Sequence, residues 1–267
     1  MKGFSHLRKN KRVTTTLKSM VVILIFLLAV FGKDVFQAYL PFQIGTPLLK
    51  ILHAYSWWFF PGVLCTGILF GFRKIGRNLG FSSSPIKAFL FSLVSVSPML
   101  ISSAIVGSFN ENLTFLQLLH GTLLAGLMEE FLFRGFLFGL LFRKLGWGFI
   151  PAGLIGASIF GWAHLYQGTT VAETLGIFLV TFLGALWFAW LYIEWNNNLW
   201  VPIFLHILMN LSWMLFDVGE NALGDILTNV FRVATIVITV LVTIRHRKQI
   251  GYFTITRKNL WMHAFTK

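Results

Sequence analysis

The chain has 267 residues, of which 56% are hydrophobic and only 12% are charged. In soluble domains about a quarter of all residues are charged. This composition therefore excludes an ordinary water-soluble protein and indicates a lipid bilayer as the solvent. A formal net charge of +13 is also found in nucleic-acid-binding proteins, but basic residues that flank apolar segments are typical of membrane orientation signals, and we expect no nucleic-acid partner.

Eight apolar segments are long enough to cross a bilayer as helices. The first, residues 20–40, follows a basic stretch and lacks the small-residue cleavage site of a secretory signal, so we interpret it as a retained span. The others are residues 52–72, 88–106, 114–142, 147–164, 175–193, 199–216 and 226–244. The sequence therefore predicts an all-α, polytopic bundle of about eight transmembrane helices, embedded in the lipid bilayer as a multi-pass protein of the cell membrane.

The distribution of charge predicts how the bundle is oriented. If the N-terminus is cytoplasmic, most of the 22 Lys and Arg residues fall in inner loops or in the C-terminal tail. The outer loops then collect the acidic residues Glu111, Glu173, Asp217, Glu220 and Asp225. Since basic loops stay on the cytoplasmic side, we expect both termini there.

We find no internal repeat and no long linker, so the chain is predicted to be one integral membrane unit. Residues 1–113 hold the first three spans and a basic cytoplasmic N-terminus. Residues 114–216 hold spans four to seven, and residues 217–267 hold the last span and a basic cytoplasmic tail.

The middle of the fourth predicted span carries the ionisable side chains Glu129, Glu130 and Arg134. Such side chains cost about 2.5–3.5 kcal/mol at mid-membrane on insertion scales, so they usually have a partner or a function. Glu130 and Arg134 are four residues apart and can pair on one helix face. An ion pair that only holds helices together explains these two, but it does not explain Glu129, which is rotated by about 100°. An unpaired carboxylate in this position is typical of a general acid or base.

Two further spans carry polar side chains at helical spacing. Phe160 and His164 are four residues apart near the end of the fifth span, and His206 and Asn210 are four apart in the seventh. Alone, each pattern equally fits polar side chains that join membrane helices. At the helical rise of 1.5 Å per residue, Glu129 and His164 both lie about 20 Å from the cytoplasmic ends of their spans, so we expect the clusters to converge.

In this order, the three clusters resemble the CAAX protease and bacteriocin-processing (CPBP) family of intramembrane proteases, also called the Abi or CAAX prenyl protease 2-like family. The family motifs are E-E-x-x-x-R, F-x-x-x-H and H-x-x-x-N. Each is complete here, as Glu129-Glu130-x-x-x-Arg134, Phe160-x-x-x-His164 and His206-x-x-x-Asn210. The resemblance covers about residues 116–211, so residues 114–216 are expected to form a CAAX-protease-like catalytic core.

The resemblance implies hydrolysis of a peptide bond in a membrane-associated protein or peptide. Carried over by position, Glu129 and His164 would activate a water molecule. His206 and Asn210 would stabilise the oxyanion, a contribution of about 2.7–4 kcal/mol per donor in other enzymes. Structural support would come from Glu130, Arg134 and Phe160.

The cofactor requirement stays open at this point, because the family is described both as metalloproteases and as glutamate proteases. Glu129, His164 and His206 have the chemistry of a zinc site with an open position. The H-E-x-x-H spacing of many zinc peptidases is absent, and we favour catalysis without a metal.

Two other functions compete with proteolysis. The first is a non-catalytic membrane protein of the same family that acts in immunity or binds a peptide, since some family members are described as self-immunity proteins. The second is a small-solute transporter, which predicts repeated halves with broken helices. The absence of a repeat disfavours this second alternative.

Overall fold

The computed structural model describes residues 2–39, 44–216, 218–219 and 221–262, and of residues 2–12 it describes the backbone alone. Within these residues the chain is helical, and the only extended pairing is an isolated bridge between Trp147 and Met262. The all-α prediction is therefore confirmed. Asp217 and Glu220, which we expected in an outer loop, lie outside the described residues.

Each predicted apolar segment coincides with a helix. The main helices are α1 (Lys2–Tyr39), α2 (Pro47–Phe70), α3 (Ile75–Leu79), α4 (Pro85–Val106), α8 (Phe149–Ala163), α9 (Val171–Glu194), α10 (Trp200–Leu215) and α11 (Ile226–Ile250). Short 3₁₀ turns are η1 (Phe72–Lys74), η4 (Leu165–Gln167) and η5 (Arg257–Asn259). Among the described residues, 5 helices are long and apolar enough to cross a membrane, or 6 if the bent α2–α3 pair is one span. The count of eight and the cytoplasmic termini stay predictions.

The predicted fourth span is a single helical run with two wide turns. It consists of α5 (Phe115–Leu118), η2 (Leu119–Leu124), α6 (Ala125–Glu129), η3 (Glu130–Phe138) and α7 (Gly139–Leu145), of which η2 and η3 are π-helical. Every residue of η3 is buried. π-helical turns are rare and frequently occur at functional sites. The E-E motif lies where η3 begins, so its position in this buried stretch fits a functional site.

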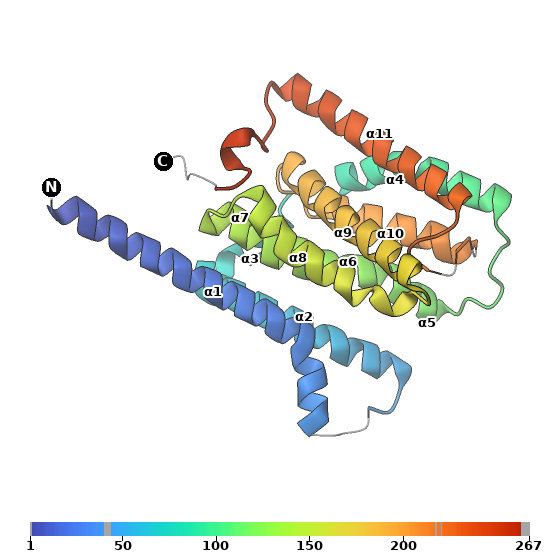
Figure 1. The fold of residues 1–267 in the computed structure, drawn as a ribbon, viewed down its shortest axis with the longest axis horizontal. Coiled ribbons are helices and arrows are strands. Elements are labelled where there is room, and N and C mark those ends of the chain that lie inside the picture. Colours follow the sequence, from blue (N-terminus) through green and yellow to red (C-terminus); the bar gives the residue numbers. More distant parts are fainter. Residues whose placement is uncertain (1, 40–43, 217, 220, 263–267) are drawn as a thin grey trace.

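The helices pack in three groups (Figure 1). The run α5–α7 lies in the middle with α8, α9 and α10, while α4 and α11 cover one side and α1 and α2 the other. We call the end of the bundle that holds α3, α7 and the two chain ends the basic end. The opposite end holds α5 and the loop that precedes α11.

Short sequence signals explain where the long helices begin. Thr46, Ser84 and Thr170 each accept a hydrogen bond from a first-turn backbone N–H, at α2, α4 and α9 respectively. Pro47 and Pro85 follow the first two caps, where a missing N–H costs nothing. Local capping therefore determines the residue at which each of these three helices begins.

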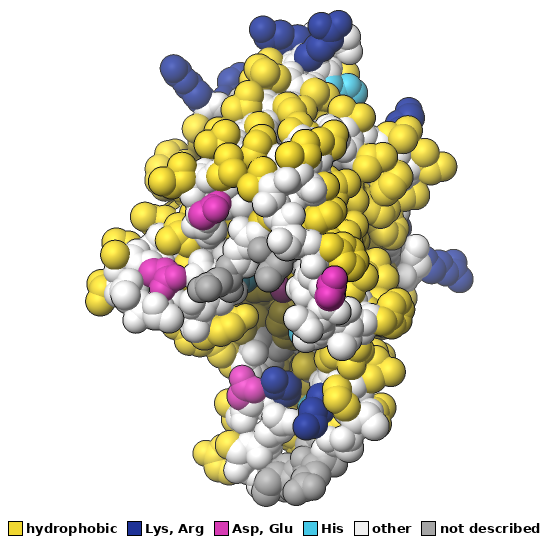
Figure 2. Space-filling view, turned by 90° about the vertical axis from the view of Figure 1, so that its right-hand side faces the viewer, with side chains coloured by type: hydrophobic (Ala, Val, Ile, Leu, Met, Phe, Trp, Pro, Cys, Tyr) yellow, Lys and Arg dark blue, Asp and Glu magenta, His cyan; other side chains and the backbone are white. Residues whose placement is uncertain are grey.

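The surface is apolar over much of the bundle. Large side chains such as Val94, Ile68 and Leu183 are 63%, 71% and 59% exposed on three different helices. Figure 2 views the molecule from the end opposite the basic end, and hydrophobic side chains cover much of that view. An apolar surface of this extent on long helices indicates that the protein resides in a membrane.

Candidate active site

The ion pair predicted within the first motif is present and buried. Arg134 Nη1 lies 3.1 Å from Glu130 Oε1, and the two side chains are 3% and 0% exposed. The guanidinium also lies over the rings of Phe160 and Phe188, at 4.8 and 5.5 Å from their centroids. The aromatic faces and the carboxylate together compensate a cation that would otherwise be costly in the interior.

The third motif meets the first through His206. Its Nδ1 atom lies 2.8 Å from Glu130 Oε1, and its Nε2 atom lies 3.8 Å from Glu129 Oε2. The imidazole of α10 is therefore flanked by the two carboxylates of the E-E pair, so the predicted convergence of these clusters is confirmed. The sequence analysis assigned Glu130 to Arg134 alone and missed its contact with His206, because a separation of 76 residues leaves no local signal.

A glycine allows this close approach of α6 and α10. A Cβ atom at Gly126 would lie 2.6 Å from Ile207 Cγ1 and 3.1 Å from the Ile207 backbone nitrogen. Both distances are shorter than ordinary carbon contacts, so a side chain there would push the helices apart. Gly126 thus brings Glu129 and Glu130 within reach of His206.

One carboxylate oxygen of Glu129 is buried without a hydrogen bond from the described residues. Its side chain is 18% exposed, and its buried Oε2 atom has no hydrogen-bond partner among the described residues. The phenol of Tyr55, on α2, lies within electrostatic range of this carboxylate. A single tyrosine in an apolar span forms no motif, so the sequence gives no sign of this neighbour.

The second motif joins the site through Phe160. His164 directly follows α8, and its Nδ1 donates to the Phe160 carbonyl at 2.7 Å. This bond places the ring proton of a neutral imidazole on Nδ1 and leaves Nε2 with a free lone pair. The Phe160 ring lies between the His164 ring, 4.5 Å away, and the Arg134 guanidinium. His164 is therefore connected to the E-E pair through an aromatic ring.

Asn210 lies one helical turn beyond His206 on α10. Its Nδ2 atom donates to the Gly121 carbonyl at 2.8 Å. An amide nitrogen carries two hydrogens, and no other hydrogen bond engages this one among the described residues. The second hydrogen is thus available to a ligand.

The arrangement does not fit a shared metal ion. No group of three His, Cys, Asp or Glu side chains in the described part of the chain is placed to hold one. Glu129, His164 and His206 have the right chemistry, but both ring nitrogens of His206 face carboxylates of the E-E pair. The preference for metal-free catalysis stays a prediction.

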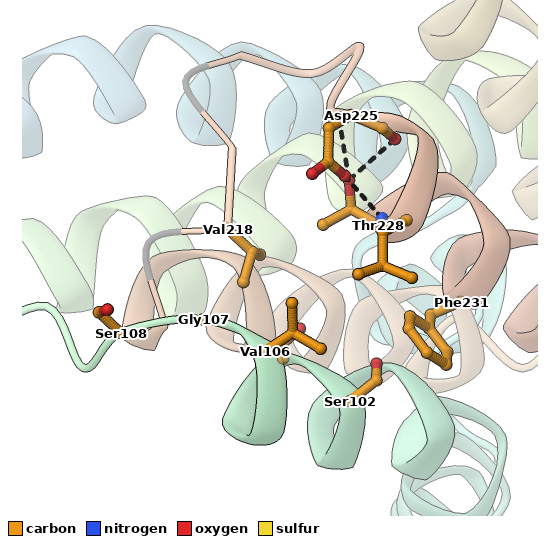
Figure 3. Close-up of a pocket in the computed structure, with 10 residues that line it drawn as sticks. Ser102, Val106, Gly107, Ser108, Val218, Asp225, Thr228 and Phe231 are labelled. Atoms are coloured by element: carbon orange, nitrogen blue, oxygen red, sulfur yellow. Dashed lines mark hydrogen bonds between the residues drawn. The ribbon is translucent and has the colours of Figure 1, made fainter.

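One pocket lies away from the motifs. It has a volume of about 320 Å³ between the end of α4 and the start of α11, where Val106, Asp225 and Phe231 contribute to its lining (Figure 3). The Asp225 carboxylate caps α11 by accepting from the hydroxyl and from the backbone N–H of Thr228, and these hydrogen bonds lower the pKa of Asp225. None of the motif residues lines this pocket, so we do not assign it to the active site.

Comparison with known proteins gives two matches. Residues 110–212 match the Rce1-like family, described as type II CAAX prenyl endopeptidase Rce1-like. Over 190 residues the chain is 31% identical to YdiL of Bacillus subtilis (strain 168), which is described as a putative membrane peptidase. The aligned region is 71% of this chain and 64% of YdiL, so the chain spans somewhat less than two thirds of that relative. No solved structure matches the chain.

The matched region contains all of the motif residues, from Glu129 to Asn210. It also includes the helices that bring them together, from α6 to α10. The order of the three motifs, the match to the family and the apolar helical bundle lead to one conclusion: this membrane protein belongs to the Rce1-like CAAX protease family, the CPBP family.

Proposed function

We propose that the protein is a multi-pass intramembrane endopeptidase of the cell membrane that hydrolyses a peptide bond in a membrane-associated protein or peptide. The observation that carries this proposal is the state of Glu129. Its buried Oε2 atom lies 3.8 Å from His206 Nε2 but has no hydrogen bond among the described residues, and a buried polar atom without a hydrogen bond is costly. A general base that must accept a proton from water needs such a free oxygen.

In the proposed reaction, a water molecule attacks the carbonyl carbon of the scissile bond and transfers a proton to Glu129. The free Nε2 of His164 accepts the second hydrogen of the water as a hydrogen bond and orients it. His206, as an imidazolium that donates from Nδ1 to Glu130, donates its second ring proton from Nε2 to the oxyanion of the tetrahedral intermediate, and the second amide hydrogen of Asn210 donates to the same oxygen. The carbon–nitrogen bond then breaks, and Glu129 returns its proton to the leaving nitrogen. The products are a carboxylic acid and an amine, which become a carboxylate and an ammonium by proton exchange, and the chain needs no other reactant.

Glu130, Arg134 and Phe160 act as positioning residues in this scheme. Glu130 accepts from His206 Nδ1, which directs Nε2 toward Glu129. Phe160 contacts both Arg134 and His164. These contacts are supplied by buried side chains, so the donors are oriented before the substrate binds.

The test is a comparison of the N-termini of membrane proteins in cells that express the wild type, Glu129→Gln or Glu111→Gln. Glu111 lies in a loop, is exposed, and serves as a control with the same chemical change. We expect termini that depend on wild-type protein, persist with Glu111→Gln and vanish with Glu129→Gln, while all three proteins reach the membrane in equal amount. General base catalysis contributes about 10²–10⁴-fold, so the loss should be close to complete. Equal termini in all three samples would favour the non-catalytic alternative, a membrane immunity or peptide-binding protein.

A further inference from the structure

Four basic side chains gather at the basic end without an acidic neighbour. They are Lys74 of η1, Arg77 of α3, and Arg143 and Lys144 of α7. Lys144 lies beyond the predicted fourth span and is only partly exposed. Burial, and then the charges of Arg143, Arg77 and Lys74, lower the pKa of its ammonium group. Four positive charges from two segments of the chain therefore repel one another in one small region.

The described carboxylates are engaged elsewhere. Asp34 pairs with Lys33, Glu130 with Arg134 and Glu194 with Arg247, while Glu173 and Asp225 are held by hydrogen bonds near the opposite end. The residues that the structure describes therefore form no ion pair with Lys74, Arg77 or Lys144.

Arg143 holds the cluster together. Its guanidinium donates to the backbone carbonyls of Asn78, at 3.1 Å, and Arg77, at 3.2 Å, and to the hydroxyl of Tyr192. These bonds fasten α3 to α7 although the two helices are more than 60 residues apart in sequence. The guanidinium of Arg143 is satisfied by these hydrogen bonds. Lys74 and Arg77 are exposed and lie close to Lys144.

A sharp bend after α2 exposes these side chains at the end of the bundle. The chain turns by 110° between α2 and the η1–α3 segment, so α3 crosses the end of the bundle. Lys74 and Arg77 are exposed on it, while Asn78 and Leu79 are buried. Phe72, beside them, is 58% exposed. An exposed aromatic ring next to basic side chains is typical of a segment that lies in the interface.

We propose that Lys74, Arg77 and Lys144 form a binding site for the phosphate headgroup of an anionic phospholipid in the leaflet at the basic end. The phosphate relieves the mutual repulsion of the cations, and Phe72 contacts the upper part of the acyl chains. A bound lipid also bridges α3 and α7, which adds to the contacts of Arg143. The site is separate from the Glu129 site and does not depend on the proposed proteolysis.

The first test compares two triple variants, each of which removes three positive charges. Lys74→Gln, Arg77→Gln, Lys144→Gln removes the site, and Arg245→Gln, Lys248→Gln, Lys258→Gln removes exposed basic residues near the C-terminus. Native mass spectrometry of the purified full chain measures binding of phosphatidylglycerol and phosphatidylcholine. We expect the first variant to bind phosphatidylglycerol at least about tenfold more weakly than the wild type, and the control variant to keep wild-type affinity. Equal losses in both variants, or no preference for phosphatidylglycerol over phosphatidylcholine, would overturn the proposal.

The second test uses the wild-type protein, so it does not depend on the folding of a variant. The chain is placed in nanodiscs of phosphatidylcholine with or without phosphatidylglycerol, and lysine acetylation is followed by mass spectrometry. We expect phosphatidylglycerol to protect Lys74 and Lys144 but not Lys248 and Lys258. Protection of all four lysines would indicate a diffuse effect of surface charge. Protection by dilute inorganic phosphate alone would indicate a site for the free ion. Either result contradicts a lipid site.

Discussion

His206 donates from Nδ1 to Oε1 of Glu130 at 2.8 Å, and the same oxygen atom forms an ion pair with Arg134 Nη1 at 3.1 Å. One fully buried carboxylate thus serves a stabilising cation on its own helix and a site histidine on α10. Because both contacts use the same group, changes at Glu130 should affect stability and catalysis together. Changes at Arg134 should act mainly through stability.

Arg134→Ala is expected to lower stability more than it lowers the activity of the molecules that fold. The substitution leaves Glu130 as a buried charge without its cation, at a cost of about 3–5 kcal/mol. Thermal unfolding in detergent and the yield of monodisperse protein measure this loss.

The double variant Glu130→Gln, Arg134→Met separates the two roles of Glu130. It removes both buried charges, so we expect much of the lost yield to return. The neutral amide no longer supplies the negative charge beside His206, so we expect activity to stay at least about tenfold below wild type, within the range for a lost positioning contact. A double variant that is no more stable than Arg134→Ala would show that the pairing is wrongly assigned.

Gly126→Val is expected to weaken both the fold and the site. The new side chain meets Ile207 and separates α6 from α10, at a cost of about 1–3 kcal/mol for overpacking. Gly184→Val is the matched control, because a Cβ at Gly184 in α9 would meet nothing within 4 Å. Melting temperatures and peptidase activity are measured for both variants. Similar effects at the two glycines would contradict the close approach of α6 and α10.

Asn210→Ala is expected to reduce kcat by about 10²–10³-fold with little change in KM, the result of removing one oxyanion donor. The substitution also removes the hydrogen bond to the Gly121 carbonyl. Asn229→Ala controls for such a structural loss, because the Asn229 amide donates to the Leu223 and Asp225 carbonyls away from the site. If the two variants lose activity in parallel with stability, Asn210 has no role in the chemistry.

Removal of metal distinguishes the two candidate chemistries. If Glu129 and His164 activate water directly, activity survives prolonged chelation, and elemental analysis of active protein finds no stoichiometric metal. This is the outcome we expect. One zinc per active chain, lost together with activity and restored with it, would instead assign Glu129, His164 and His206 as ligands.

Much of this protein follows from its sequence. The apolar segments predict the helices because the bilayer leaves no other partner for the backbone hydrogen bonds. The four-residue spacing predicts the Glu130–Arg134 pair because residues in successive turns share a helix face. The same geometry predicts that Glu129 has no ion-pair partner on its own helix. These are local relations, and each can be read within one turn of helix.

The tertiary structure decided what occurs between helices. The contact of Glu130 with His206 depends on the approach of α6 and α10 at Gly126, and the position of Tyr55 beside Glu129 depends on how α2 packs. The basic cluster depends on the 110° turn after α2. Hydrophobic periodicity shows which segments enter the membrane, but it does not determine the rotation and depth of one helix relative to another. Those are set by side-chain packing between residues far apart in the chain.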